Sequence, residues 1–139
     1  MKLIIRILIA IFLITTLNTK AQHSTKYKEF NVGLFISSND DLVFPGASFL
    51  WGKTIYVSNA FLIDYEYGFA LPTLLTGKIG CGLGNNNHSL TFGLRPWPAS
   101  LYLQYTLKEK HLLSIEFMSN QYASDIYDLP LIINYGYRW

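Results

Sequence analysis

The 139-residue sequence has few charges and almost no cysteine, and each shortage excludes a class of protein. Only 14% of its residues are charged, whereas a typical soluble domain has about 25%. A small soluble domain covers its large surface with Lys and Glu, and this composition cannot do so. The single cysteine, Cys81, excludes an internal disulfide framework. A formal net charge of only +2, without a Lys/Arg cluster, gives no basis for a nucleic-acid partner.

The chain also lacks an apolar run long enough to form a membrane-spanning helix. The apolar run Ile7–Ile14 follows Lys2 and Arg6 and gives way to more polar residues up to Ala21. A spanning helix needs about 20 apolar residues. A short basic start, a short apolar run and a small final residue are typical of a secretory signal peptide. We therefore expect residues 1–21 to be removed on export and residues 22–139 to form one domain.

What the mature chain has in abundance is strict alternation of apolar and polar residues. Half of the sequence is hydrophobic and 16% is aromatic, and no convincing helical stripe follows Tyr27. Period-two alternation separated by turn residues predicts strands. Pro45, and later the segment Pro96–Pro98, should limit regular pairing because proline cannot donate to a ladder, and residues 53–59 are ambiguous. The alternation predicts about eight strands, over residues 27–36, 44–52, 60–70, 73–83, 88–95, 99–107, 111–118 and 131–139.

The polar face of these strands predicts the interior of a narrow barrel. Alternation alone fits both a soluble barrel with its apolar face inside and a membrane barrel with that face outside. The polar face holds mainly Gly, Ser, Thr and Asn, which suit an eight-stranded lumen filled by side chains. Its isolated charges nearly balance, as a buried network requires. We expect Glu29 to pair with Arg138, and Asp64 and Glu66 with Lys78. The predicted interior charge network consists of Glu29, Asp64, Glu66, Lys78, Arg95, Glu116 and Arg138.

The opposite face carries almost no charge and holds most of the aromatic residues. Tyr and Trp favour the level of lipid headgroups because each has an apolar body and a polar group. A closed barrel also leaves no unpaired sheet edge in lipid. The predicted membrane-interface aromatics are Tyr65, Tyr67, Trp97, Tyr105, Tyr135, Tyr137 and Trp139.

With this pattern, residues 27–139 resemble the small eight-stranded outer-membrane β-barrel proteins of Gram-negative bacteria. The most specific element is the alternating last strand, which ends on the aromatic Trp139. The resemblance implies an all-β fold, a single antiparallel up-and-down transmembrane barrel with both termini in the periplasm. It also implies surrounding outer-membrane lipid and recognition of the C-terminal strand by the barrel-assembly machinery. We expect a monomer.

No catalytic, cofactor-binding or metal-binding residue is predicted. His88 beside Ser89, and His111 near Ser114, fall on opposite faces of their strands and cannot share a proton. The glycines of residues 77–84 lack the following helix that a phosphate loop needs. We therefore expect a non-enzymatic outer-membrane barrel of structural or interaction role, with a lumen plugged by side chains. The alternatives are an outer-membrane lipid-modifying hydrolase and a soluble exported barrel that binds an apolar ligand.

Overall fold

The computed structural model describes residues 23–37, 42–71, 73–97, 99–118 and 130–139. The expected signal peptide, residues 1–21, and the long loop that begins at residue 119 lie outside this described part. No helix in the described part is long and apolar enough to cross a membrane. The eight strands are β1 (His23–Ser37), β2 (Leu42–Tyr56), β3 (Phe61–Leu71), β4 (Leu74–Gly84), β5 (His88–Trp97), β6 (Ser100–Leu107), β7 (His111–Met118) and β8 (Leu131–Arg138).

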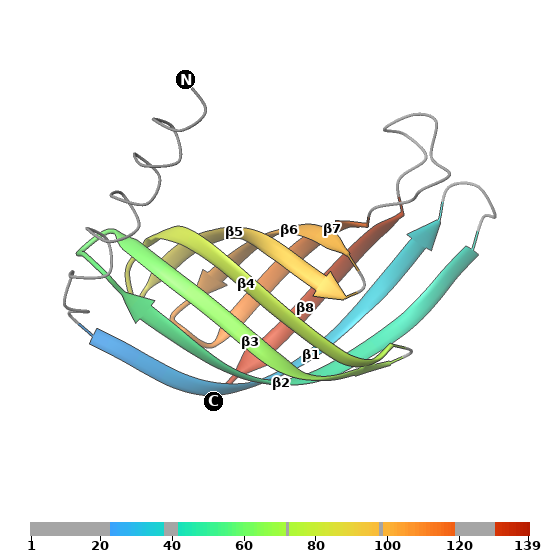
Figure 1. Ribbon diagram of the computed structural model, residues 1–139, viewed down its shortest axis with the longest axis horizontal. Coiled ribbons are helices and arrows are strands. Elements are labelled where there is room, and N and C mark those ends of the chain that lie inside the picture. Colours follow the sequence, from blue (N-terminus) through green and yellow to red (C-terminus); the bar gives the residue numbers. More distant parts are fainter. Residues whose placement is uncertain (1–22, 38–41, 72, 98, 119–129) are drawn as a thin grey trace, which may run out of the picture.

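The strands form one closed barrel in which each strand pairs antiparallel with the next and β8 pairs with β1 (Figure 1). The predicted all-β, up-and-down architecture of about eight antiparallel strands is confirmed. Paired residues followed once round the barrel from Lys26 lead back to β1 at Ile36. This stagger tilts the strands, and with eight strands it leaves an interior just wide enough for side chains to fill.

The barrel is polar inside and apolar outside. Along β3, β5, β6 and β7, buried and exposed residues alternate almost without exception. The exposed positions are large apolar residues, such as Phe69 at 57% and Phe92 at 55% exposure, whereas the buried positions include all seven charged residues expected inside. Successive side chains in a strand point to opposite faces, so the alternation in sequence places the polar side chains inside the barrel and the apolar ones outside.

The two ends of the barrel differ. The terminal end carries the start of β1, the end of β8 and the turns at residues 57–60, 85–87 and 108–110. In the last of these turns, Lys108 and Glu109 have φ of 52° and 56°, as a type I′ hairpin turn requires. The opposite end, here called the loop end, carries the other connections. There β1 and β2 project beyond the rest of the barrel (Figure 1).

Strand β2 is longer than the sequence predicted, at both of its ends. It continues through the ambiguous residues to Tyr56, and it starts before Pro45, which lies opposite Leu34 in the ladder. Because β3 stops at Leu71, opposite Ala47, the chain at Pro45 has a neighbouring strand on one side only. An edge position tolerates proline, since no second ladder bond is lost.

The prediction that Pro96–Pro98 interrupts pairing holds at Pro96, which has no partner in either neighbouring strand, but is wrong for Trp97; Pro98 lies outside the described residues. Strand β5 continues to Trp97, which lies opposite Gly77, while Leu94 lies opposite Ile79. Two residues of β5 therefore oppose one of β4, which is a β-bulge and accommodates an extra residue. The bulge also reverses the alternation, so that Arg95 is buried in the lumen whereas Trp97 is 68% exposed outside.

Candidate functional site

The candidate site is the polar lumen, which contains two clusters of ion pairs. The first is centred on Arg138, near the terminal end of β8. Its Nε donates to Glu29 Oε2 at 2.6 Å, and its Nη2 donates to Asp64 Oδ2 at 3.0 Å and to Glu66 Oε1 at 2.9 Å. The expected pair of Glu29 and Arg138 is thus present, and one guanidinium serves three carboxylates from β1 and β3.

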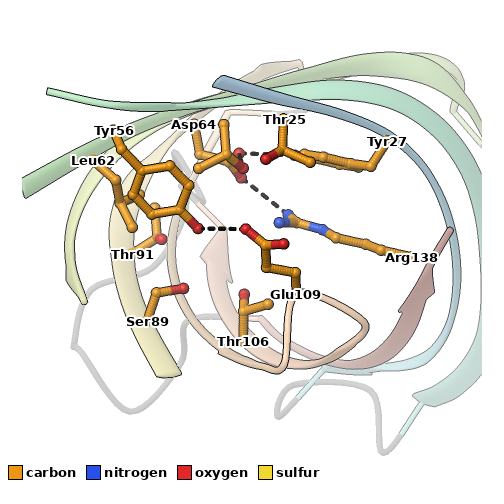
Figure 2. A pocket seen from close by; sticks show the side chains of 11 residues that line it. Thr25, Tyr27, Tyr56, Leu62, Asp64, Ser89, Thr91, Thr106, Glu109 and Arg138 are labelled. Carbon is orange, nitrogen blue, oxygen red and sulfur yellow. Dashed lines mark hydrogen bonds and ion pairs between the residues drawn. The ribbon is translucent and has the colours of Figure 1, made fainter. Parts of the chain in front are cut away.

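Neutral side chains complete the Arg138 cluster. The Tyr27 ring lies 3.8 Å from the Arg138 guanidinium carbon, in a cation–π contact. Its hydroxyl donates to Asp64 Oδ1 at 2.9 Å, and the Thr54 hydroxyl donates to the same oxygen at 2.6 Å. Figure 2 shows Arg138 extended alongside the Tyr27 ring toward Asp64. Buried ions cost several kcal/mol each unless they are paired and hydrogen-bonded, and this shell supplies those partners.

The second cluster is centred on Glu116 of β7. Arg95 Nη2 lies 2.7 Å and Lys78 Nζ 3.2 Å from Glu116 Oε1, and the Asn134 amide donates to the same oxygen at 3.0 Å. The Ser100 hydroxyl lies 3.4 Å from the other carboxylate oxygen. One carboxylate therefore holds two cations, both almost fully buried.

The predicted pairing of Lys78 with Asp64 and Glu66 is wrong. Lys78 lies opposite Glu66 in the β3–β4 ladder, but its ammonium pairs with Glu116 on β7, across the lumen. In so narrow a barrel, a long side chain reaches a strand on the far wall as easily as its neighbour. Asp64 and Glu66 are satisfied instead by Arg138, which also crosses the lumen from β8.

The two clusters carry opposite formal charge. With every group ionised, Arg138 and its three carboxylates have a net charge of −2, whereas Glu116 with Lys78 and Arg95 has a net charge of +1. The lumen is therefore anionic toward the terminal end and cationic toward the loop end. This axial separation did not follow from the near balance of charges counted in the sequence.

Glycines allow aromatic rings to fill the central lumen. A Cβ placed on Gly52 would overlap the Tyr27 ring, and one placed on Gly93 would lie 2.8 Å from Tyr102 Cε1. Tyr102 is only 1% exposed and lies under the Lys78 ammonium, 5.4 Å from its ring centroid. The alternation gives both Tyr27 and Tyr102 inward parity, but the sequence-based prediction stressed small residues inside and did not include the filling of the lumen by these two rings.

The lumen at the terminal end is nearly closed. A cavity of about 20 Å³ remains among Thr25, Tyr27, Tyr56, Arg138 and their neighbours, which is room for about one water molecule. The Tyr56 hydroxyl donates to Glu109 Oε1 at 2.9 Å and links the wall to the turn that caps this end (Figure 2).

The loop end is hollow. A cavity of about 490 Å³ lies above the Glu116 cluster and is lined by Gly33, Phe35, Phe44, Gly46, Ala47, Ser48, Ala70, Leu71, Thr73, Arg95, Met118, Ile132 and Asn134. Its walls are mostly apolar, and Arg95 and Asn134 form its polar floor. The side chains that fill the terminal end therefore do not fill the whole lumen. Sequence analysis missed this, although Phe35 and Ile132 are apolar residues at inward positions of strand ends.

All seven aromatic residues assigned to the membrane interface lie on the outer surface, each at least 38% exposed. They are Tyr65, Tyr67, Trp97, Tyr105, Tyr135, Tyr137 and Trp139. At the terminal end, Trp139 stacks on Tyr137, with ring centroids 6.3 Å apart. Backbone bonds of 3.0 Å in both directions join Trp139 to Lys28 and extend the β1–β8 seam to the last residue.

His88 and His111 are exposed on the outside of the barrel, on the opposite face from Ser89 and Ser114. His88 Nδ1 is hydrogen-bonded to the Tyr105 hydroxyl at 2.6 Å, and His111 Nδ1 to that of Tyr135 at 2.7 Å. Ser89 and Ser114 are buried in the lumen. Within the described residues, no group of three or more His, Cys, Asp or Glu side chains is arranged to hold a metal ion.

No protein-family model and no curated protein matches this sequence. Two solved structures have a similar arrangement. The crystal structure of Ail, the attachment invasion locus protein of Yersinia pestis, in complex with the heparin analogue sucrose octasulfate, is 12% identical with a TM-score of 0.44, over 84% of this chain and 97% of that chain. A structure from the de novo design of transmembrane β-barrels is 15% identical with a TM-score of 0.37, over 86% of this chain and all of the designed one.

Proposed function

We propose that this chain is an exported, integral outer-membrane β-barrel with a structural or interaction role and no catalytic activity. The single observation that carries the proposal is the inverted polarity of the barrel. Buried positions hold Glu29, Asp64, Glu66 and Glu116, none more than 3% exposed, while large apolar side chains cover the outside.

Lipid explains this inversion better than water does. Soluble monomers rarely expose an apolar patch of more than a few hundred Å², and here apolar residues from all eight strands are exposed. Closure leaves no sheet edge unpaired, which suits a medium that cannot hydrogen-bond to the backbone. The strands are eight to fifteen residues long, which is close to or above the roughly 9–11 residues that a tilted strand needs to cross a bilayer.

The outer aromatics fit the two interfaces of such a membrane. We place Tyr137 and Trp139 at the headgroups on the terminal side, and Trp97, next to the β5–β6 turn, at the opposite interface. The resemblance to small outer-membrane barrels implies that the terminal end lies in the periplasm. The last strand, complete to Trp139, would be the segment that the assembly machinery binds.

The same geometry supports a barrel that conducts no ions. Arg138 bridges β8, β1 and β3 across the lumen, and Tyr27 and Tyr102 occupy the space beside the charges. Water and ions would have to pass through a terminal end with room for about one water molecule. A hydrolase, by contrast, needs its nucleophile and base on one face, and His88 and Ser89 lie on opposite faces.

Fractionation and gel mobility test the proposal. The full chain should sediment with the outer membrane and migrate differently on gels before and after heating, because a folded barrel resists unfolding by detergent. The purified protein should give no stepwise conductance in planar bilayers. Recovery in the soluble periplasm without a mobility shift would overturn the membrane assignment, and stable channels would overturn the closed lumen.

A further inference from the structure

We propose that the loop-end cavity is a binding site for a single-chain amphiphile with an anionic head, such as a fatty acid. This goes beyond the proposed membrane role, which requires no ligand. At about 490 Å³, the cavity lies within the range of small-molecule sites. Its volume is about 25 times that of the space at the terminal end.

The walls of the cavity select an apolar body. Phe35 and Phe44 project from the β1–β2 hairpin, and Ala70, Met118 and Ile132 complete the wall from β3, β7 and β8. These are apolar residues at inward positions, whereas most inward residues elsewhere in the lumen are polar or glycine, with the buried Leu50, Leu62 and Leu112 as exceptions. The burial of an alkyl chain against them is favourable by about 25 cal/mol per Å² of apolar surface removed from water.

The floor of the cavity selects a negative head. Arg95 lines the cavity and is only 8% exposed. Its Nε has no hydrogen-bond partner among the described residues. Its Nη2 is held by Glu116, so the side chain is fixed in position while Nε remains available. The Glu116 cluster has a formal net charge of +1, which one carboxylate or phosphate would neutralise. The Thr73 hydroxyl, also in the lining and without a hydrogen-bond partner among the described residues, is a second donor.

The lining of the cavity reaches the end of β3. Ala47 and Leu71 form the last pair between β2 and β3, both belong to the lining, and beyond them β2 pairs with β1 alone. Leu71 is 65% exposed on the outer surface. An alkyl chain can therefore pass over this low point in the wall, from the apolar exterior into the lumen, without crossing the ion-pair clusters.

The matched variants are Gly46→Leu and Gly77→Leu. In both, the first added carbon meets only a backbone carbonyl, 3.2 Å away: Leu71 O for Gly46 and Glu66 O for Gly77. The Gly46 side chain would project into the cavity, whereas that of Gly77 would project outward from β4. The third variant, Arg95→Gln, removes the floor cation while Lys78 continues to pair with Glu116.

The test is photo-crosslinking of the full mature chain in nanodiscs by a diazirine-bearing fatty acid, with labelled residues mapped by mass spectrometry. We expect labels on Phe35, Met118 or Ile132. Labelling should fall at least tenfold in Gly46→Leu and in Arg95→Gln and should be unchanged in Gly77→Leu. A primary alcohol with the same chain should label at least tenfold less than the acid, because it lacks the charge.

Equal labelling of the wild type and Gly46→Leu would overturn the site, since the label would then report lipid on the outer surface. Equal labelling by acid and alcohol would overturn the anionic head. The same photoreactive chain carried by phosphatidylglycerol distinguishes a free acid from a membrane lipid, and cavity labelling by phosphatidylglycerol equal to that by the acid would overturn the assignment to a single-chain amphiphile. Each variant is first checked for the heat-dependent gel shift, so that failure of the membrane barrel itself is recognised separately.

Discussion

Replacement of Arg138 by methionine tests whether the ion-pair network stabilises the barrel. The substitution keeps an unbranched, though shorter, side chain and removes the only cation within 4 Å of Glu29, Asp64 and Glu66 among the described residues. Loss of one partner from a buried ion pair costs about 3–5 kcal/mol, because the remaining charge is left uncompensated. Here three carboxylates are left, and the cation–π contact with Tyr27 is lost as well, so we expect the upper part of that range.

Arg95→Met is the matched control. Arg95 is also a buried arginine bound to a carboxylate, but Glu116 keeps Lys78 at 3.2 Å and the Asn134 amide at 3.0 Å. Its removal therefore costs one charge-assisted hydrogen bond, about 1.5–3 kcal/mol. Arg138→Met should be the more destabilising of the two, and the added change Glu66→Gln should recover about 1 kcal/mol of its loss by removing one unpaired charge.

The assay is urea unfolding of the purified chain after refolding into lipid vesicles, followed by tryptophan fluorescence. In this format the assembly machinery plays no part, so an effect of residue 138 on recognition of the last strand does not enter. Equal losses for Arg138→Met and Arg95→Met, or no recovery on adding Glu66→Gln, would refute the assignment of three carboxylates to one guanidinium.

Three further predictions concern the outer face, the packed lumen and the seam. Phe92 lies in the middle of an exposed apolar strand face, so Phe92→Arg should lower the free energy of unfolding in vesicles by about 2–4 kcal/mol, whereas Trp97→Arg, near an interface, should lower it by about 0–1 kcal/mol. A soluble barrel would show neither loss in the same urea titration. Gly93→Val should lower the free energy of unfolding by about 1–3 kcal/mol, because its Cβ would lie 2.5 Å from Gly80 Cα and would also meet Tyr102. Gly77→Val should change it by no more than about 0.5 kcal/mol. Similar urea midpoints for the two variants would contradict this packing. Deletion of Trp139, which removes two backbone bonds to β1, should lower the fraction of heat-modifiable protein in cells more than Trp97→Ala does, as measured by immunoblot of outer-membrane fractions.

Sequence alone was sufficient to predict the number of strands, their order and the burial of all seven charges. The reason is physical: with a repeat of two residues, any strand with one polar face must turn that whole face inward or outward together. The pairing of Glu29 with Arg138 could also be predicted, because the first and last strands of a closed antiparallel barrel are neighbours and these two residues lie opposite each other.

Contacts across the lumen and local breaks in alternation could not be predicted in this way. Lys78 meets Glu116 on a strand three places away, and that contact depends on the stagger of the barrel, which no single strand encodes. Trp97 has the parity of Arg95 in the sequence. Its position outside agrees with the prediction made from its aromatic side chain, but the bulge at Arg95 and Pro96, which inserts one residue and turns Trp97 outward, was not predicted. Pro96 was a signal of irregularity, but the sequence did not say whether pairing would end or bulge.

The position of the hollow follows from a part of the pattern that was present in the sequence but not used. Inward residues near the middle of the strands and toward the terminal end are mainly polar or glycine, and they meet partners across a narrow lumen. Phe35, Phe44, Met118 and Ile132 have inward parity but lie near loop-end strand termini. An apolar inward residue cannot join an ion-pair network, so several of them at one end divide the lumen into a polar filled part and an apolar part. Arg95 lies at the boundary between the two, which is why its unpartnered Nε, rather than the better-paired Arg138, is the group we expect to bind a ligand.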